Sequence, residues 1–315
     1  MRRLGVQMEL EMRQQPGVLA ENSARYLSEF SDCLKGCSFD MVLLAARGSS
    51  DHAALYARYL IEVYLKVPVS LAAPSVLTRF GSRLNYPKTL CIGISQSGAA
   101  PDVSEVLADL RSQDHSTLAI TNTEGSRLTT EAENAVILGA GPENSIAATK
   151  TYTTSLLACY QLVRALGGDL PEPVLPTDSW TDETESAADD YLGPIVRCSP
   201  LFALGRGWGF CTAEETALKL MECALLAVKS YSVADFAHGP KALADSGAAA
   251  ICYGEVPTDL AKTGCEIVTA PRGPEGPASA VWEIMFGQWL ALKAARARGL
   301  DPDHAQNLSK VTKTL

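Results

Sequence analysis

The first half of the chain alternates short apolar runs with longer amphipathic stretches. The apolar runs lie at residues 41–46, 67–73, 89–95, 116–122 and 135–140. Uninterrupted runs of Val, Ile, Leu and Ala predict strands that are buried on both faces. The amphipathic stretches predict helices over residues 52–66, 101–113 and 149–166. Strands that alternate with helices in this way are typical of a parallel sheet covered on both sides.

Two other stretches differ from this pattern. Residues 8–27 predict a helix that is broken at Pro16, because a proline inside a helix removes a backbone hydrogen bond. Residues 168–190 are rich in proline and acidic side chains, which indicates a linker followed by a solvated helix.

The pattern then restarts. Residues 43–62 and 201–222 share an apolar strand, an Arg-Gly pair, a short loop and an amphipathic helix, so that Arg47-Gly48 corresponds to Arg206-Gly207. A repeat of roughly 160 residues predicts two similar α/β units. Further strands are expected at residues 248–254 and 265–271, and the short interval between them leaves little room for a helix.

These patterns predict five parts along the chain. They are an N-terminal helical segment (1–40), a first domain (41–170), a linker and helix (171–194), a shortened second domain (195–300) and a tail (301–315).

Composition narrows the classes of function. The chain has 315 residues and a net charge of -9, whereas nucleic-acid-binding proteins usually carry a basic stripe. An anionic substrate remains compatible with a locally positive site. No apolar run approaches the roughly 18 residues that a membrane span needs, and the N-terminus is too charged for a signal peptide. We therefore expect no nucleic-acid and no membrane partner.

The chain contains nine cysteines, an odd number, and no CxxC motif. This usage predicts a reduced chain in the cytoplasm. Metal binding by Cys33 and Cys37 with distant histidines is a weak alternative, and we expect neither a metal nor another cofactor.

Three loops of small, hydroxyl-bearing residues precede helices. They comprise residues 47–50, 95–98 and 145–150. Backbone N–H groups, hydroxyls and a helix dipole together bind a phosphate without a nearby cation. Alternatively, Ser95 and Ser97 serve only as cap and turn residues. The sequence has no GxxxxGK[ST] motif and no complete GxGxxG motif, so a nucleotide-dependent enzyme is not favoured.

The second unit carries ionisable candidates. Lys219 and Glu222 are three residues apart and share a helix face, although a surface ion pair that also involves Glu215 is the simpler interpretation. His238 precedes a Gly-Pro turn and is one of only four histidines. Lys310 lies near the C-terminus, where solvation alone would explain it.

Six motifs occur in a characteristic order: RGSSD, SQSG, AATK, ALKLMEC, HGP and NLSKVT. Together they resemble the SIS (sugar isomerase) family, and within it the isomerase half of glucosamine-6-phosphate synthases and the SIS-type glucosamine-6-phosphate deaminases. The leading MELEMRQQP is similar to the E-[IM]-x-x-Q-P segment that opens that isomerase half. The agreement covers nearly the whole chain.

The resemblance implies two SIS units, each a five-stranded parallel sheet in a three-layer αβα sandwich of flavodoxin-like type, assembled as a homodimer. It also implies sugar-phosphate chemistry without a metal or nucleotide cofactor. The residues that it assigns to the substrate phosphate are Ser50, Ser95, Gln96 and Ser97. Those that it assigns to other parts of the substrate site are Gly48, Ser49, Ala148 and Ser309.

The catalytic roles come from the same resemblance. Glu222 is the base that moves a proton between sugar C1 and C2, and Lys219 lies beside it. His238, supplied by the partner subunit, assists ring opening. Lys310 closes the site from the C-terminal tail together with Ser309.

The chain departs from the family at several positions. Ala100 stands where the family often has Thr or Ser, and Ala148 stands where the synthase has Ser. The synthase also begins with a glutaminase domain whose cysteine follows the initiator Met, whereas Arg2 follows Met1 here. We therefore expect ammonia to be released from glucosamine-6-phosphate, giving fructose-6-phosphate.

Three other functions remain open at this point. One is an isomerase or deglycase that acts on a fructosamine or galactosamine phosphate. Another is a synthase-like protein without the glutaminase, which would use free ammonia. The third is a sensor that binds a sugar phosphate without turnover.

Overall fold

The computed structural model describes residues 3–310 and divides them into two compact units. The first-sheet unit contains residues 18–142 and 150–173. The second-sheet unit contains the chain up to Gly17, Glu143–Thr149 and Val174–Lys310. Each unit is described by itself below.

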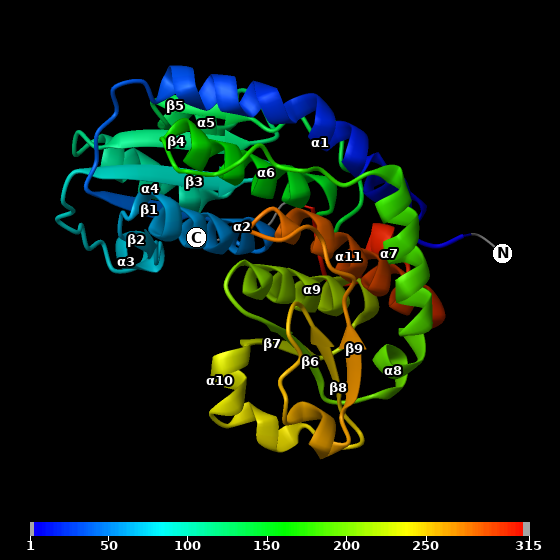
Figure 1. Ribbon diagram of the computed structural model, residues 1–315. Helices are drawn as coiled ribbons and strands as arrows, with labels where there is room; N and C mark the ends of the chain where they lie inside the picture. Colours follow the sequence, from blue (N-terminus) through cyan, green and yellow to red (C-terminus); the bar gives the residue numbers. More distant parts are fainter. Residues whose placement is uncertain (1–2, 311–315) are drawn as a thin grey trace. The chain divides into compact units, whose positions relative to one another are not determined.

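A five-stranded parallel sheet forms the centre of the first-sheet unit (Figure 1). Its strands are β1 (Met41–Ala45), β2 (Val69–Leu71), β3 (Thr89–Ser95), β4 (Ser116–Thr121) and β5 (Asn134–Ile137). They lie in the order β2-β1-β3-β4-β5, which is the flavodoxin-like order. All seven residues of β3 are buried, as the uninterrupted apolar run predicts for a central strand.

Helices separate these strands along the chain. They are α2 (Ser49–Leu60), the π-helical turn η1 (Ile61–Leu65), α3 (Ser75–Thr78), α4 (Pro101–Arg111), α5 (Arg127–Glu131) and α6 (Lys150–Ala165). Leu107 of α4 packs in one apolar cluster with Cys91 of β3 and Ala119 of β4, while α2 packs against α6. These contacts confirm the predicted α/β class.

The second-sheet unit has a parallel sheet of four strands. They are β6 (Leu201–Gly205), β7 (Val228–Ser232), β8 (Ala249–Cys252) and β9 (Glu266–Thr269), in the order β7-β6-β8-β9. The prediction of five strands is therefore wrong for this sheet within the described chain. After β9 the chain passes through a Gly- and Pro-rich stretch directly into a long helix instead of a fifth strand. The expected shortening between β8 and β9 is confirmed, since only the 3-10 turn η3 (Leu260–Thr263) lies there.

The second-sheet unit also contains helices and short 3-10 turns. The elements are α7 (Asp178–Asp190), α8 (Leu192–Arg197), α9 (Trp208–Ala224), α10 (Val233–Ala237), η2 (Pro240–Leu243), α11 (Ser279–Ala297) and η4 (Pro302–His304). The helix α11 packs between α9 and α7, and most of its residues are buried. Neither α11 nor β7 was expected from the sequence. A helix that is apolar on nearly all sides has no polar face to reveal its period.

The Arg-Gly repeat is confirmed at the level of the backbone. Gly48 caps α2 with φ 57° and ψ -133°, and Gly207 caps α9 with φ 59° and ψ -132°. A side chain strongly disfavours this conformation, so both positions require glycine. The two units therefore turn from the first strand into the first helix in the same way.

The predicted break at Pro16 is wrong, because α1 (Val6–Cys33) runs through it. Proline cannot donate to the carbonyl of the residue four positions earlier, which is Met12 here. The side-chain amide of Gln15 donates to that carbonyl instead, at 3.0 Å. The same amide donates to Oε1 of Gln288 on α11 at 2.9 Å, so the helix continues without an orphaned acceptor.

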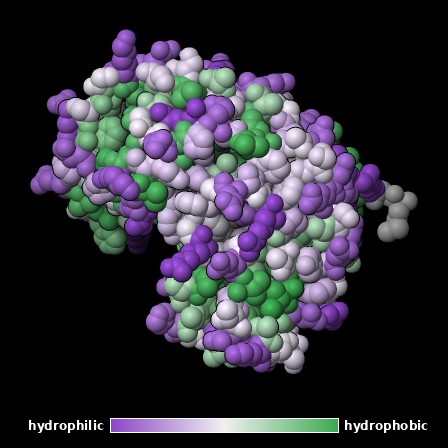
Figure 2. Space-filling model, viewed as in Figure 1, coloured by the Kyte–Doolittle hydropathy of each residue, from purple (hydrophilic) through white to green (hydrophobic). Residues whose placement is uncertain are grey.

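The surface is of mixed character. Figure 2 shows hydrophilic and hydrophobic residues interspersed over the visible face. No helix among residues 3–310 combines the length and the apolar character that crossing a membrane requires.

Replacing Gln15 by methionine tests this account of the helix. Gln15→Met should lower the free energy of unfolding by about 2–4 kcal/mol, because it leaves buried acceptors on Met12 and Gln288 without their donor. Urea unfolding followed by circular dichroism measures this. Gln7→Met, at an exposed position of the same helix, should change stability by less than about 0.5 kcal/mol. Equal effects of the two substitutions would contradict the explanation.

Candidate active site

The loops after β1 and β3 lie side by side in the first-sheet unit. The two strands are hydrogen-bonded neighbours, with Ala45 paired to Gly93. The strand order reverses direction between them, and ligands of open parallel sheets bind at this switch point beyond the carboxyl ends of the strands. Gly48 ends the loop after β1, Ser49 and Ser50 begin α2, and β3 ends at Ser95. The structure therefore brings the predicted phosphate-binding residues to the expected edge of one sheet.

The SQSG segment forms a tight turn between β3 and α4. Oγ of Ser95 accepts a hydrogen bond from the Gly98 N–H at 3.2 Å, and Oγ of Ser97 accepts from the Ala99 N–H at 3.3 Å. Gly98 has φ 61°, and a Cβ there would lie 2.1 Å from Oγ of Ser126. Both serines thus serve the turn, as the alternative interpretation expects. A hydroxyl that accepts a hydrogen bond still has its own hydrogen to donate, so the two roles are compatible.

A cation that was not among the predicted site residues lies beside this turn. Nε of Arg47 donates to Oδ2 of Asp102, in the first turn of α4, at 2.7 Å. The Asp102 carboxylate is buried, whereas 47% of the Arg47 side chain is exposed. The guanidinium can therefore contact an anion in solution while Asp102 holds it in place. The Arg-Gly repeat could have predicted this position of Arg47, because the repeat places the arginine just before the first helix.

Ala100 is the N-cap residue of α4, with φ -67° and ψ 112°, and it supplies no side-chain cap. Ser, Thr, Asp and Asn are preferred at this position because their oxygen accepts a hydrogen bond from the first turn. The departure at Ala100 therefore removes a helix cap as well as a hydroxyl beside the predicted phosphate loop.

Three ionisable residues of α9 form a compact cluster in the second-sheet unit. Nζ of Lys219 lies 2.5 Å from Oε2 of Glu222 and 3.4 Å from Oε1 of Glu215. The Lys219 side chain is 1% exposed and Glu215 is fully buried, whereas 23% of Glu222 is exposed. The interpretation as a surface ion pair is therefore wrong. Glu215, which the sequence analysis weighed only as an ion-pair partner, belongs to the cluster because the spacing i, i+4 and i+7 puts all three on one helix face.

The two carboxylates fix the charge of Lys219. Burial alone would lower the pKa of Lys219, but Glu215 and Glu222 outweigh it and raise that pKa above its ordinary value. Lys219 consequently remains an ammonium ion at neutral pH. It can hold a carboxylate or offset a developing negative charge, but it cannot remove a proton.

The exposed part of this cluster borders a small pocket within the same unit. The pocket has a volume of about 160 Å³. Its lining residues are Glu222, Cys223, Leu225, Gly299, Leu300, Asp301, His304, Ala305 and Gln306. The carboxylate of Glu222 is thus the member of the cluster that a small molecule can reach.

His238 lies apart from this cluster in the chain. It is exposed directly after α10, and its N–H donates to the Asp235 carbonyl at 3.0 Å. Its side chain makes no hydrogen bond or ion pair within residues 3–310. The described contacts therefore do not bring His238 to Glu222 of the same chain.

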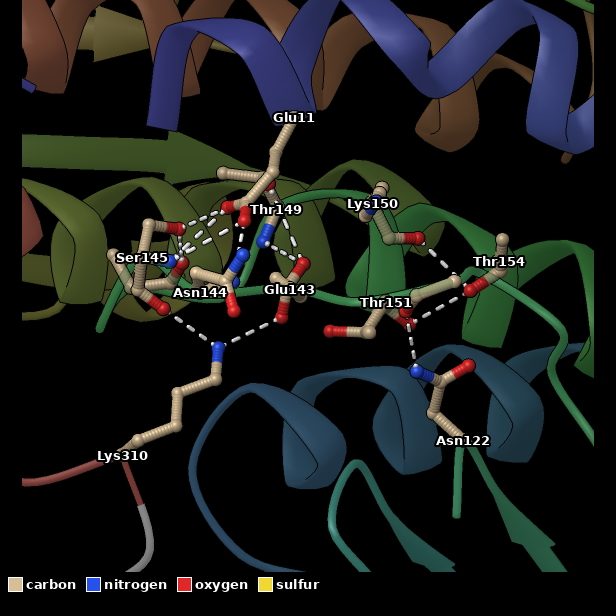
Figure 3. A network of polar contacts seen from close by, with 12 residues as sticks. Glu11, Asn122, Glu143, Asn144, Ser145, Thr149, Lys150, Thr151, Thr154 and Lys310 are labelled. Atoms are coloured by element: carbon tan, nitrogen blue, oxygen red, sulfur yellow. Dashed lines mark hydrogen bonds and ion pairs between the residues drawn. The ribbon is translucent and has the colours of Figure 1, made fainter. Parts of the chain in front are cut away.

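The tail places Lys310 against a loop of the second-sheet unit (Figure 3). Nζ of Lys310 lies 3.0 Å from Oε2 of Glu143 and donates to the Ser145 carbonyl at 2.7 Å. The Glu143 side chain is buried and also accepts from the Thr149 N–H at 3.0 Å. Lys310 is therefore not merely a solvated lysine. The half-buried Ala148 lies in the same loop, while Ser309 is exposed beside Lys310.

The described cysteines do not cluster with other metal-ligating side chains. All nine cysteines have free thiols, and Cys33 and Cys37 are half-buried. Across residues 3–310, no three side chains of His, Cys, Asp and Glu are placed to hold a metal ion.

Comparison with known proteins agrees with the two-sheet architecture. Residues 40–165 match the family model described as the SIS domain. A glutamine–fructose-6-phosphate aminotransferase (isomerizing) from Methanothermobacter thermautotrophicus is 32% identical over 305 residues, which cover 86% of this chain and 51% of the relative. The chain thus spans about half the length of the curated relatives that it matches.

Two solved structures share the fold. One is the C-terminal domain of glucosamine-fructose-6-phosphate aminotransferase from Francisella tularensis, with a TM-score of 0.77 and 22% identity over 94% of this chain and 96% of that one. The other is glucosamine-6-phosphate deaminase from Thermotoga maritima, with a TM-score of 0.76 and 22% identity over 94% of this chain and all of that one (100%). At this level of identity the likeness establishes the fold.

Removing the buried cation tests the electrostatics of α9. Lys219→Met should lower the free energy of unfolding by about 3–5 kcal/mol at pH 7.5, because Glu215 is left as a buried charge without its cation. The loss should be smaller at pH 5.5, since a buried carboxylate without a cation has a raised pKa and can take up a proton. Urea titrations at both pH values measure this. Lys241→Met, which breaks an exposed pair with Asp259, should cost less than about 1 kcal/mol at either pH.

Proposed function

We propose, from the match of residues 40–165 to the SIS domain, that the chain is an enzyme that converts glucosamine-6-phosphate and water into fructose-6-phosphate and ammonia. The observation that carries this assignment is the cluster on α9, where a partly exposed carboxylate is held by a buried ammonium. A carboxylate placed in this way suits proton transfer between neighbouring carbon atoms. The relatives named as aminotransferases support an amino-sugar phosphate as the substrate.

Phosphate recognition is assigned to the first-sheet unit. The hydroxyls of Ser50, Ser95 and Ser97, the side chain of Gln96 and the N-terminus of α4 supply hydrogen-bond donors at the switch point of the sheet. Arg47 adds a positive charge there. A phosphate bound in this way anchors the substrate without taking part in the reaction.

Proton transfer is assigned to the second-sheet unit and to a second copy of the chain. The sugar ring opens when a base takes the proton of the C1 hydroxyl and an acid protonates the ring oxygen. The partner subunit's His238 is the candidate for both transfers, since an imidazole can accept a proton at one nitrogen and donate one from the other. The exposure of the histidine in one chain supports this role.

Glu222 then removes the C2 proton of the open-chain aldehyde, and the electron pair forms a C1–C2 double bond. Negative charge develops on the C1 oxygen, where an ammonium group such as Lys219 or Lys310 offsets it. The C1 oxygen takes up a proton from water to give an enolamine, and Glu222 returns its own proton to C1 while the nitrogen lone pair forms the C=N bond of an iminium at C2. Water adds to C2, ammonia departs and one proton is released, which gives the ketone of fructose-6-phosphate.

The direct test incubates the purified chain with glucosamine-6-phosphate and measures ammonia and fructose-6-phosphate. Wild type should form both in equal amounts, and Glu222→Gln should reduce kcat by roughly 10²- to 10⁴-fold, because the amide cannot accept the C2 proton. Glu266→Gln, at an exposed position of β9, should retain wild-type turnover.

The same assay with fructosamine and galactosamine phosphates identifies a different preferred substrate. Thermal stabilisation by a sugar phosphate without ammonia release would support a sensor instead of an enzyme. Unchanged turnover in Glu222→Gln would exclude the proposed base.

The phosphate loop has a separate test. Ser97→Ala should raise KM for the phosphorylated sugar by roughly 5- to 30-fold, the equivalent of about 1–2 kcal/mol for one lost hydrogen bond to a charged group. Ala100→Thr should lower KM and should also stabilise the fold by capping α4. Ser116→Ala, at the opposite end of the same sheet, should leave KM unchanged. An unaltered KM in Ser97→Ala would contradict the loop assignment.

A further inference from the structure

Glu11 of α1 is a buried acid that the proposed mechanism does not use. Its side chain belongs to the second-sheet unit, and the residue is 2% exposed. One carboxylate oxygen accepts the Asn144 N–H, and the other accepts the Ser145 hydroxyl at 2.5 Å; the Ser145 N–H lies 3.3 Å from both oxygens (Figure 3). Three donors from one short segment therefore converge on a single carboxylate.

The segment that Glu11 holds is also the segment that binds Lys310. The Ser145 residue donates to Glu11 through its N–H and its hydroxyl, while its carbonyl accepts from Nζ of Lys310 at 2.7 Å. Figure 3 shows Glu11 and Lys310 approaching this residue from different sides. A shift of the segment would move both acceptors of the Lys310 ammonium, since Glu143 lies two residues before Ser145.

The other end of the loop depends on the same helix. Gln15 lies one turn after Glu11 and donates to Gln288, and Gln288 donates in turn to the Thr149 carbonyl at 3.3 Å. The loop Glu143–Thr149 is thus held at its beginning by Glu11 and at its end through Gln15. The motif MELEMRQQP contains both side chains.

We propose that Glu11 is a positioning residue for Lys310, acting through Ser145 and the loop Glu143–Thr149. The role of Lys310 in catalysis rests on the proposed function, but its placement does not. Burial raises the pKa of Glu11, and hydrogen bonds from Ser145 and Asn144 oppose that rise only in part. A carboxylate suits this position because it accepts three hydrogen bonds without offering a donor of its own.

The substitution that separates these roles is Glu11→Gln. It keeps the volume of the side chain but replaces one acceptor oxygen by an NH₂ group, so that the Ser145 N–H and the Ser145 hydroxyl can no longer both donate to that position and the segment is held less firmly. The matched control is Glu9→Gln on the same helix, because Glu9 is also buried but pairs with Arg3, Arg13 and Arg296 outside the loop.

The first measurement does not depend on activity. Limited acetylation of the intact chain with acetic anhydride, read by mass spectrometry of peptides, reports how accessible and how well bound each lysine amine is. Lys310 should react at least about threefold faster in Glu11→Gln than in wild type. Lys293, which pairs with Asp189 and Glu185, serves as the internal reference. If Lys310 reacts equally in wild type, Glu11→Gln and Glu9→Gln, the inference is overturned.

A milder variant covers the case in which Glu11→Gln does not fold. Ser145→Ala removes only the hydroxyl donor and keeps the backbone contacts, so it should fold and give a smaller rise in Lys310 acetylation. An unchanged Lys310 rate in a folded Ser145→Ala protein would likewise count against Glu11 acting through this segment.

The second measurement is a double-mutant cycle on the proposed reaction. If Glu11 acts through Lys310, Glu11→Gln should lower kcat at least about fivefold in wild type but change it little in a Lys310→Ala background. Additive losses would show that Glu11 acts by another route and would overturn the inference. A wild-type chain without activity on any sugar phosphate would refute the proposed function, while the acetylation result would still decide the position of Lys310.

Discussion

A charge removed from water must meet an opposite charge or a set of hydrogen-bond donors, and this constraint organises the chemistry of the second-sheet unit. Lys219 is buried between two carboxylates of its own helix. Glu143 is buried against Lys310, and Glu11 is buried against three donors of one loop segment. Each pairing fixes where a helix, a loop or the tail must lie. The charged residues therefore stabilise one arrangement of the unit in addition to offering reactive groups.

The first-sheet unit offers an anion mainly hydrogen-bond donors instead of buried charged side chains. Its candidate loop uses hydroxyls, backbone N–H groups and the N-terminal end of α4, and the cation beside it, Arg47, is tethered to a buried aspartate. Arg47 is the more exposed partner of that pair, so its charge remains available to a ligand. The absence of a lysine within the SQSG segment is then understandable, since the positive charge reaches the loop from the neighbouring strand.

Local pattern predicted most of the first-sheet unit, because central strands of a parallel sheet are uninterrupted apolar runs and every strand is followed by a helix or a turn. Where a tertiary contact decides the structure, the sequence was insufficient. Pro16 indicated a break, but the amide of Gln15 replaces the missing donor and Gln288 is far away in the chain. The burial of Lys219 depends on the packing of α11 against α9, and α11 itself has no clear polar face. The contacts of Lys310 depend on a loop more than 160 residues earlier in the chain.

The charges and the burial of the residues on α9 also limit which of them can transfer a proton. A lysine whose pKa is raised by two carboxylates is an ammonium throughout the physiological range, so it acts only as a charge. In the proposed reaction, proton removal is therefore assigned to a carboxylate, and Glu222 is the one of the pair that borders the pocket, whereas Glu215 is fully buried. Lys310 is held by one carboxylate and one carbonyl at a partly exposed position, which leaves its ammonium the more adaptable of the two. If the reaction proceeds as proposed, Lys219 would be a fixed cation that holds the base, and Lys310 a second cation that can follow the substrate while negative charge appears briefly on an oxygen.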